Sequence, residues 1–180
     1  MGLRGRAQLI ERMGLAAEAD GLPRIAGRLF GALLLSDEPR SLDELAEALG
    51  VSKGSVSTDA RRLLERGVVE RVARPGDRRD YYQLAPDFFG QIIRHRVARW
   101  EAFSTIVAEM AAAAPAPSAE LRARFAYVQA VHDFIVARVE DALRAWADRG
   151  PTRRRGRARF PRRARTRRGQ PVAGAGLRQP

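Results

Sequence analysis

The chain has 180 residues, and its 33 Lys and Arg against 21 Asp and Glu give a formal net charge of +12 at pH 7. The lack of Cys excludes disulfides, thiolate metal sites and a Cys nucleophile, and two His support a metal sensor poorly. No stretch of about 18 apolar residues suits a membrane span, and no leader precedes a cleavage site. We therefore expect a cytoplasmic protein with no metal, no cofactor and no membrane contact.

Most of the excess positive charge lies at the C-terminus. Residues 151–180 contain eleven Arg and no acid, which leaves 22 basic and 21 acidic groups in the first 150 residues. The segment combines Arg with Pro, Gly and Ala and has almost nothing to bury, so we expect residues 150–180 to form a disordered tail. Three interpretations stay open: a solvated tail, a tail that attracts phosphates non-specifically, and an out-of-frame reading of GC-rich DNA.

The first 40 residues predict two helices. Residues 6–19 form the first, and we expect the N-terminal region at 1–20 to join a dimer interface. A boundary at Asp20-Gly21 precedes Pro23, which is tolerated in the first turn of an apolar second helix. Arg24 and Arg28 on that helix could reach phosphates, although surface salt bridges account for them equally well.

A short, sharply bounded helix comes next. Ser41 and Glu44 have the spacing of a capping box, in which the Ser41 hydroxyl accepts from the Glu44 amide while Glu44 reaches back. Gly50 stands where a left-handed residue ends the helix. We expect Val51 to fill the following turn as a buried residue.

A second helix follows after this turn. Ser52 is placed to cap it, and the helix is expected to run from Lys53 to about Arg66, closed by Gly67. Two capped helices joined by a turn of this length predict a helix-turn-helix.

The second helix has two unlike faces, as a helix that enters a DNA major groove requires. Val56, Ala60, Leu63 and Leu64 can pack inward. Ser and Thr can donate to phosphates or base edges, and Arg can grip guanine with two parallel hydrogen bonds. The candidate DNA-contacting residues of this recognition helix are Ser52, Lys53, Ser55, Ser57, Thr58, Arg61 and Arg62.

Two β-rich runs, at 68–73 and 81–84, flank a Pro-Gly turn and predict a hairpin wing. Arginine on a hairpin tip suits a narrow minor groove. The candidate wing residues are Arg74, Arg78 and Arg79, with Asp77 orienting one of them. Residues 53–79 hold eight basic and four acidic groups, so the local charge of +4 coincides with the proposed DNA face.

These motifs resemble the MarR-type winged-helix regulators, and within them the branch typified by the glycine-betaine synthesis repressor. The resemblance is dense over 21–86 and looser to about 148. It is carried by residues 21–31, 42–46, 51–57, 64–70 and 75–79. The family's wing pattern, Asp, any residue, Arg, corresponds to Asp77 and Arg79, which favours Arg79 over Arg78 as the minor-groove probe. The resemblance also implies an obligate dimer that regulates transcription, with effectors that differ widely between members.

Two long helices are expected after the wing. Asp87 can cap the first, from Phe88 to about Ala113, and the second starts after Ser118 beyond a Pro-rich break. Apolar residues of the second helix recur at alternating spacings of four and three, which indicates a packing seam in a dimer interface. The seam comprises Leu121, Phe125, Val128, His132, Ile135, Val139, Ala142 and Trp146, and Tyr127, Val131, Phe134, Val136 and Leu143 widen it.

Some residues in these helices admit two interpretations. His132 is either a ligand or pH sensor or a polar residue that fixes helix register, and we favour the second. His95 is more simply a solvated residue. Six aromatic residues could line a cage for a quaternary ammonium, or they could be ordinary core residues of packed helices, and we again favour the second interpretation. The aromatics concerned are Phe88, Phe89, Trp100, Phe103, Tyr127 and Phe134.

The sequence therefore predicts a mainly α fold with a small β-hairpin wing, a winged helix-turn-helix followed by long dimerisation helices. The expected parts are the N-terminal helix at 1–20, the DNA-binding domain at 21–86, the dimerisation region at 87–149 and the tail at 150–180. We expect a homodimeric, sequence-specific transcriptional regulator that acts on a pseudo-palindromic operator. The resemblance most commonly implies repression. The alternatives are a non-specific DNA-binding protein and a protein-interaction module. No pattern typical of an enzyme is present.

Overall fold

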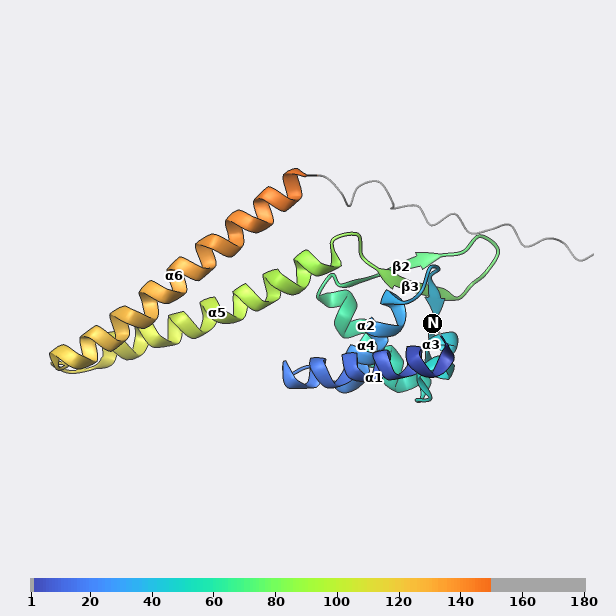
Figure 1. The fold of residues 1–180 in the computed structure, drawn as a ribbon, viewed down its shortest axis with the longest axis horizontal. Coiled ribbons are helices and arrows are strands. Elements are labelled where there is room, and N and C mark those ends of the chain that lie inside the picture. The colour runs from blue at the N-terminus through green and yellow to red at the C-terminus, as the bar shows by residue number, and fades with distance from the viewer. Residues whose placement is uncertain (1, 150–180) are drawn as a thin grey trace, which may run out of the picture.

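The computed structural model describes residues 2–149 and confirms a mainly helical fold with one small antiparallel sheet. Figure 1 shows a winged-helix lobe, from α1 to β3, and a hairpin of two long helices, α5 and α6, that projects from it. The tail predicted at 150–180 lies outside the described residues. The elements are α1 (Leu3–Ala19), α2 (Arg24–Leu34), β1 (Arg40–Ser41), α3 (Leu42–Leu49), α4 (Lys53–Glu65), β2 (Val69–Ala73), β3 (Asp80–Leu84), α5 (Phe88–Ala113) and α6 (Ala119–Asp148).

The predicted caps of the helix-turn-helix are confirmed. Ser41 and Glu44 form the capping box at the start of α3, and Gly50 ends that helix with a φ of 62°. The Ser52 hydroxyl accepts from the Ser55 amide at 3.2 Å to cap α4. Val51, expected to be buried in the turn, is half-buried and packs against the edge of the core.

The sheet has three strands in the order β1-β3-β2, one more than the predicted hairpin. The extra strand, β1, pairs Arg40 with Tyr82 and Ser41 with Tyr81. A strand of two residues is too short to show alternation in the sequence, so only its pairing with β3 reveals it. β3 is therefore the central strand, held on both sides.

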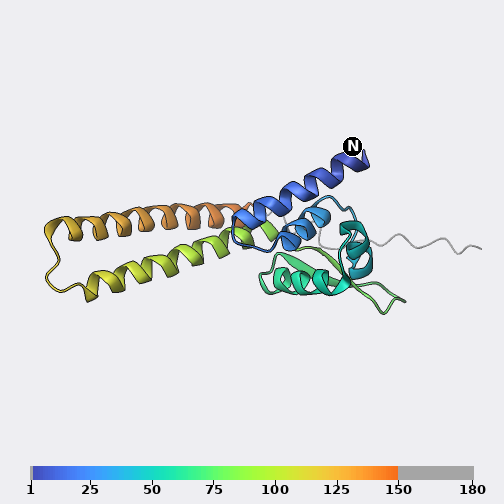
Figure 2. The ribbon, with the colours of Figure 1, turned by 90° about the horizontal axis from the view of Figure 1, so that it is seen from below.

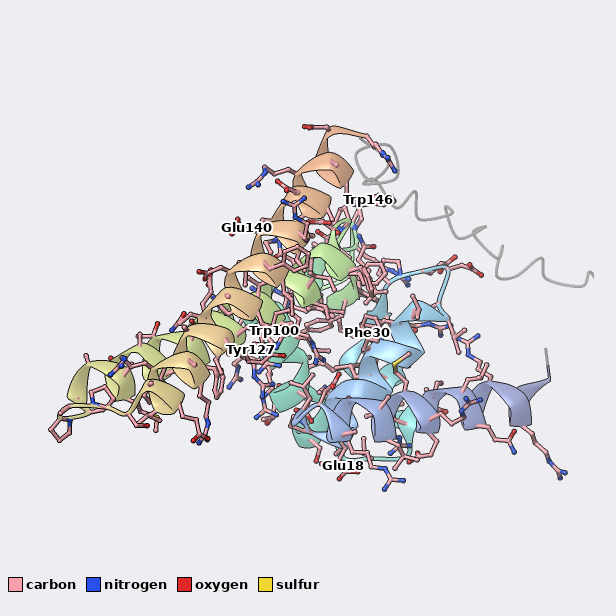
Figure 3. The ribbon with its side chains drawn as sticks, turned by 60° about the vertical axis from the view of Figure 1, so that its left-hand side comes forward. Glu18, Phe30, Trp100, Tyr127, Glu140 and Trp146 are labelled. Carbon is pink, nitrogen blue, oxygen red and sulfur yellow. The ribbon has the colours of Figure 1, made fainter. Side chains whose placement is uncertain are left out.

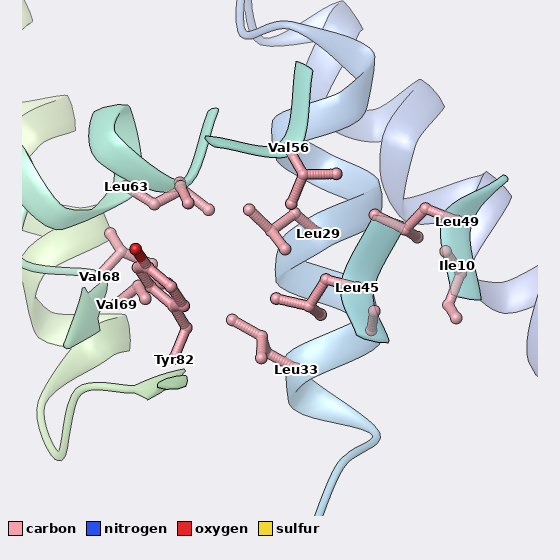
Figure 4. Close-up of a cluster of buried hydrophobic side chains, with 12 residues drawn as sticks. Ile10, Leu29, Leu33, Leu45, Leu49, Val56, Leu63, Val68, Val69 and Tyr82 are labelled. Atoms are coloured by element: carbon pink, nitrogen blue, oxygen red, sulfur yellow. The ribbon is translucent and has the colours of Figure 1, made fainter. Parts of the chain in front are cut away.

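The core of the lobe forms where α2, α3, α4 and the sheet meet, as Figure 4 shows. Leu29 and Val56 are 0% exposed and Leu45 is 1% exposed. α1 packs closely on α2, because a Cβ at Gly27 would overlap the Ala17 side chain. Within the chain α1 thus belongs to the lobe, and its participation in a dimer interface stays a prediction.

The α5–α6 hairpin is far less buried than the lobe, and Figure 2 shows its two helices lying side by side. α6 has no residue in the buried class, and α5 buries few side chains. A polar pair joins the helices: Ser104 Oγ donates to Gln129 Oε1 at 2.7 Å, and Gln129 Nε2 donates to the Ser104 carbonyl at 3.0 Å. This reciprocal pair fixes the register of α5 against α6.

Asp87 does not cap α5 as expected. Its side chain makes no capping hydrogen bond, and its carboxylate instead forms an ion pair with Arg94 one to two turns along the helix. The Asp87 backbone, with φ −111° and ψ 35°, is not in the extended conformation that a capping side chain usually requires.

Three side chains near the start of α5 connect the hairpin to the lobe. Arg96 Nη2 donates to Asp20 Oδ2 at 2.6 Å, and Arg99 Nη1 donates to the Asp20 carbonyl at 3.2 Å. His95 Nε2 lies 2.9 Å from the carbonyl oxygen of Arg66, the residue after α4. His95 is exposed, but it is not merely solvated as expected, because it contacts the end of the recognition helix.

Candidate nucleic-acid interface

The recognition helix α4 has the two faces that the sequence predicts. Val56, Ala60 and Leu63 are buried and Leu64 is half-buried. On the opposite side, Thr58 and Arg61 are exposed. The exposed members of the predicted set are Ser52, Lys53, Thr58 and Arg61, and the half-buried members are Ser55, Ser57 and Arg62.

Polar side chains in the first turns of α4 are engaged locally. Lys53 Nζ lies 2.8 Å from Asp43 Oδ1 of α3, with its side chain 61% exposed. The Ser52 and Ser55 hydroxyls are 2.9 Å apart, and the Thr58 hydroxyl donates to the Gly54 carbonyl at 3.1 Å. These contacts order the helix start, and being exposed they can exchange for contacts to a nucleic acid.

The two arginines predicted to read DNA have different environments. They are neighbours in sequence, so their side chains leave the helix about 100° apart. Arg61 is exposed and makes no hydrogen bond or ion pair among the described residues. Arg62 Nη1 donates to Asp59 Oδ1 at 3.0 Å, and the Asp59 side chain is only 8% exposed. Arg61 is therefore free to extend into solvent, while Arg62 is held beside Asp59 on the flank of the helix.

Asp59 was not among the predicted site residues. Burial raises the pKa of its carboxyl, and the positive charge of Arg62 opposes that rise. A buried carboxylate beside an arginine is typical of a group that positions its partner. The signal available in the sequence was the spacing of three between Asp59 and Arg62.

The wing loop turns at Pro75 and Gly76. The Asp77 amide donates to the Arg74 carbonyl at 3.1 Å, and Gly76 has a φ of 78°. Pro followed by a residue with positive φ is the pattern of a type II turn, which explains why Gly is present. The turn brings Asp77 back toward the start of β3.

Asp77, predicted to orient a wing arginine, accepts several hydrogen bonds from Arg79. Arg79 donates to the Asp77 carboxylate from its backbone N at 3.0 Å, from Nε at 3.1 Å and from Nη2 at 2.7 Å. The Tyr81 hydroxyl donates to the same carboxylate at 2.8 Å. The hydrogen bonds from Arg79 hold the pKa of Asp77 well below its ordinary value, and this contact raises the pKa of Arg79.

The three predicted wing arginines are not equivalent. Arg78 and Arg79 are exposed near the tip, whereas Arg74 is half-buried at the base of the wing. Arg74 Nη2 donates to the Pro39 carbonyl at 3.2 Å, and its guanidinium carbon lies 4.0 Å from the centre of the Tyr81 ring. Arg74 thus braces the wing against the segment before α3, which makes it a poorer candidate for DNA contact than the other two.

Residues of the predicted seam are mostly half-buried, because α6 packs against α5 of the same chain. The seam members Leu121, Phe125, Val128, His132 and Val139 are half-buried, whereas Ile135 and Trp146 are 37% and 47% exposed and Ala142 is exposed. His132 Nδ1 lies 3.0 Å from Asp133 Oδ1. Whether the seam also takes part in a dimer is a separate prediction.

Aromatic side chains on the hairpin remain open to solvent in the single chain. Figure 3 shows Trp100 on α5 and Tyr127 and Trp146 on α6. Of the six aromatics considered for a cage, Phe88 packs with Phe30 at 5.7 Å between ring centres and belongs to the edge of the core. The other five do not close around a ligand within one chain. Their exposures are Phe89 63%, Trp100 39%, Phe103 58%, Tyr127 70% and Phe134 68%.

Arg24 and Arg28, weighed as phosphate contacts, both form ion pairs with Glu11 of α1. Arg28 Nη2 also donates to the Leu49 carbonyl at 2.6 Å, which ties α2 to the end of α3. Among residues 2–149, no helix is long and apolar enough to cross a membrane, and no three His, Asp or Glu gather in a way that could hold a metal ion.

Comparison with known proteins gives consistent matches over this region. Residues 20–80 match the model of the MarR family. The chain is 46% identical over 91 residues to the HTH-type transcriptional regulator MmpR5 of Mycobacterium tuberculosis, a match that covers 50% of this chain and 55% of that protein. It is 32% identical over 92 residues to the HTH-type transcriptional repressor OpcR of Bacillus subtilis, covering 51% and 50% of the two chains.

A more distant match is the HTH-type transcriptional repressor GbsR of Bacillus subtilis, 30% identical over 96 residues and covering 53% of each chain. The chain thus spans about half the length of the curated relatives it matches. A crystal structure of a transcriptional regulator superposes with a TM-score of 0.67 and 35% identity, covering 80% of this chain and 99% of that one.

Proposed function

This chain belongs to the MarR family of transcriptional regulators, and we propose that it is a sequence-specific DNA-binding repressor that acts as a homodimer on a pseudo-palindromic operator. The observation that carries the proposal is the pairing of two exposed elements: a capped helix with Thr58 and Arg61 outward, and a hairpin with an ordered Arg79 at its tip. One suits a major groove and the other a minor groove.

In this mechanism α4 enters the major groove with its N-terminal half toward the bases. Ser57 and Thr58 are small enough to allow close approach, and Arg61 can donate two parallel hydrogen bonds to a guanine. The wing follows the backbone to the neighbouring minor groove, where Arg79 and Arg78 meet a negative potential. Lys53, at the start of α4, supplies phosphate attraction.

The homodimer is supported by the apolar surface of the hairpin. Phe103, Ile106 and Met110 on α5 are 55–58% exposed, and Tyr127 and Phe134 on α6 are 68–70% exposed. An apolar surface of this kind on a soluble protein favours association. A two-fold dimer would place the two copies of α4 about 34 Å apart, one turn of DNA, which is why a pseudo-palindromic operator follows.

Repression and effector control rest on the relatives and on the route from hairpin to recognition helix. OpcR and GbsR are both named repressors, and GbsR motivates placing this chain in the glycine-betaine synthesis repressor branch. The contacts of His95 with Arg66, and of Arg96 with Asp20, couple α5 to the lobe. A small-molecule effector that shifts the hairpins would therefore change the separation of the two recognition helices and weaken both half-sites together.

The proposal is tested by selecting bound duplexes from a random DNA pool at near-physiological salt. The full chain and a chain ending at Arg149 are compared, because the Arg-rich segment adds non-specific attraction to phosphates. A two-fold-symmetric motif enriched by both chains is the expected result. Binding that needs residues 150–180 and enriches no motif would indicate a non-specific DNA-binding protein.

The absence of any DNA binding by either chain would favour the remaining alternative, a winged-helix module for protein contacts.

Sedimentation of the same samples tests the dimer, since the selected operator and the protein should combine as one duplex with two chains. Arg61→Ala should then relax the preference at one position in each half-site, by about tenfold.

A further inference from the structure

We infer that Tyr81 is a positioning residue for DNA recognition: its hydroxyl anchors the Asp77 carboxylate to the central strand, and that carboxylate holds the Arg79 guanidinium ready for the minor groove. The inference rests on the proposed DNA-binding function and adds to it a residue that does not itself touch DNA. It also gives Arg74 a role at the base of the same assembly.

Tyr81 is buried on the central strand of the sheet, whereas Arg78 and Arg79 near the wing tip are exposed. Tyr81 is 1% exposed, and its backbone lies on β3 opposite Ser41 of β1 and Val72 of β2. The Arg74 guanidinium covers one part of its ring at 4.0 Å from the centroid. Burial, pairing on both sides of β3 and the Arg74 contact together restrain the phenol ring.

From this anchor a continuous path of hydrogen bonds reaches the tip. The Tyr81 hydroxyl donates to Asp77 Oδ2 at 2.8 Å, and Oδ2 also accepts from Arg79 Nη2 at 2.7 Å. The other oxygen, Oδ1, accepts from the backbone N and Nε of Arg79 at 3.0 and 3.1 Å. Oδ2 is thus shared between Tyr81 and Arg79, whereas both donors to Oδ1 belong to Arg79.

The protonation states agree with this direction of donation. Hydrogen bonds lower the pKa of Asp77, chiefly those from Arg79, so the carboxylate is ionised at neutral pH and can only accept. The hydrogen bond to Asp77 raises the pKa of Tyr81, so the phenol keeps its proton and donates. The three groups form one charge-assisted network rather than a lone surface ion pair.

The anchor matters because Arg79 is otherwise a flexible surface side chain. Its side chain is 55% exposed, and an exposed ion pair by itself gains little because holding two flexible side chains costs entropy. Fixing Asp77 to the sheet orders Arg79 before DNA arrives, which lowers the entropy lost on binding. Asp77 occupies Nε and Nη2, whereas Nη1 makes no hydrogen bond among the described residues and is left for DNA.

The test is a double-mutant cycle in the full chain, with Tyr81→Phe, Arg79→Ala and the two combined. Affinity is measured for the selected operator and for a scrambled duplex of the same length. We expect Arg79→Ala to weaken operator binding about tenfold or more, and Tyr81→Phe to weaken it about three- to tenfold, as for the loss of one ordinary hydrogen bond. The double variant should bind within about twofold of Arg79→Ala, because coupled residues are not additive.

Tyr82→Phe is the matched control. Tyr82 is the next residue of the same strand, is 7% exposed and belongs to the hydrophobic core, so its loss of a hydroxyl leaves the Asp77 network intact. It should bind the operator as wild type does. Binding to the scrambled duplex should be unchanged in Tyr81→Phe, because the charge of Arg79 remains.

A second measurement needs no DNA. Nitrogen-15 relaxation of Arg79 Nε, assigned by its loss in Arg79→Ala, should report an ordered side chain in wild type and in Tyr82→Phe and a mobile one in Tyr81→Phe. An ordered Arg79 in Tyr81→Phe would overturn the inference. So would wild-type operator affinity in that variant, or an equal loss with and without Arg79, which is the result of a purely structural role.

Failure of the proposed function gives a different pattern. A wild-type chain that binds operator and scrambled duplex equally contradicts sequence-specific recognition, and the positioning role falls with it. A wild-type chain that discriminates, with Tyr81→Phe unaffected, contradicts the positioning role alone.

Discussion

The winged-helix lobe and the α5–α6 hairpin differ sharply in how completely they bury their apolar side chains. In the lobe, Leu29 and Val56 are 0% exposed, and α1, α2, α3, α4, β2 and β3 all contribute residues to one core. In the hairpin, α6 has no residue in the buried class, and Phe134 is 68% exposed. The lobe contains its own core, whereas the hairpin presents a second apolar surface that a single chain does not cover.

The difference follows from the arrangement of apolar residues along the helices. The lobe helices α3 and α4 have one apolar face each, and the core of the lobe buries it. α6 has apolar residues on two sides: Leu121, Phe125 and Val128 lie toward α5, while Tyr127 and Phe134 are exposed. A helix with two apolar sides needs two partners, which is the physical reason for proposing a dimer.

The largest expected loss of stability in the lobe comes from Leu29→Ala. Leu29 is 0% exposed at the centre of the core, so its truncation leaves a cavity and should cost about 3 kcal/mol of unfolding free energy. That is a large share of the stability of a domain this size. Urea denaturation followed by circular dichroism measures it.

Leu34→Ala on the same helix is the control. Leu34 is 46% exposed, so we expect a loss below about 1 kcal/mol. Equal losses at the two positions would contradict the assignment of the core to the lobe.

The hairpin is tested by placing a charge on its open apolar surface. Phe134→Asp should raise the dissociation constant of the proposed dimer by tenfold or more, because a charge would be buried against a second apolar surface. The lobe should keep its fold, since Phe134 lies outside its core. Sedimentation velocity over a range of concentrations gives the dissociation constant.

Ala126→Asp is the matched change on the polar side of α6, which also bears Asp133 and Arg144. Ala126 is exposed, and its charge should leave association unchanged. If both variants sediment as wild type, the exposed aromatic face of α6 is not the surface through which two chains meet.

What the sequence predicted well was local. The capping box at Ser41, the left-handed Gly50 and the Ser52 cap depend on residues within three or four positions of each other, and all three are confirmed. The seam periodicity of α6 likewise found residues that pack against α5, although Ile135, Ala142 and Trp146 of the seam are exposed, and its part in a dimer stays a prediction. Such features are set by backbone hydrogen bonds and helical spacing, which can be read from neighbouring residues.

What the sequence missed depended on contacts between distant segments. β1 exists only because Arg40 and Ser41 pair with β3 about 40 residues later. The brace at Arg74 depends on the Pro39 carbonyl, 35 positions away. The sequence places three arginines in or beside the wing loop, but only the packed structure shows that Arg78 and Arg79 face solvent while Arg74 packs against the protein.

The smallest effect expected concerns Asp59, the buried carboxylate of the lobe. Asp59→Asn should leave the protein at least as stable as wild type at about pH 7, because burial raises the pKa of Asp59 and its ionised form is therefore a cost to folding. As pH falls through that raised pKa, the folded wild type takes up its proton before the unfolded chain does. The advantage of the variant should therefore shrink toward about pH 4, which urea denaturation at the two pH values measures.

Asp43→Asn is the control, since Asp43 is 55% exposed and pairs with Lys53 on the surface. It should change stability by about a few tenths of a kcal/mol. If Asp59→Asn were less stable than wild type at neutral pH, and this deficit shrank in acid, the pair with Arg62 would outweigh the cost of burial. In that case Asp59 would stabilise the lobe directly. The expected result instead implies that the carboxylate holds Arg62 beside the proposed DNA face at some expense of stability.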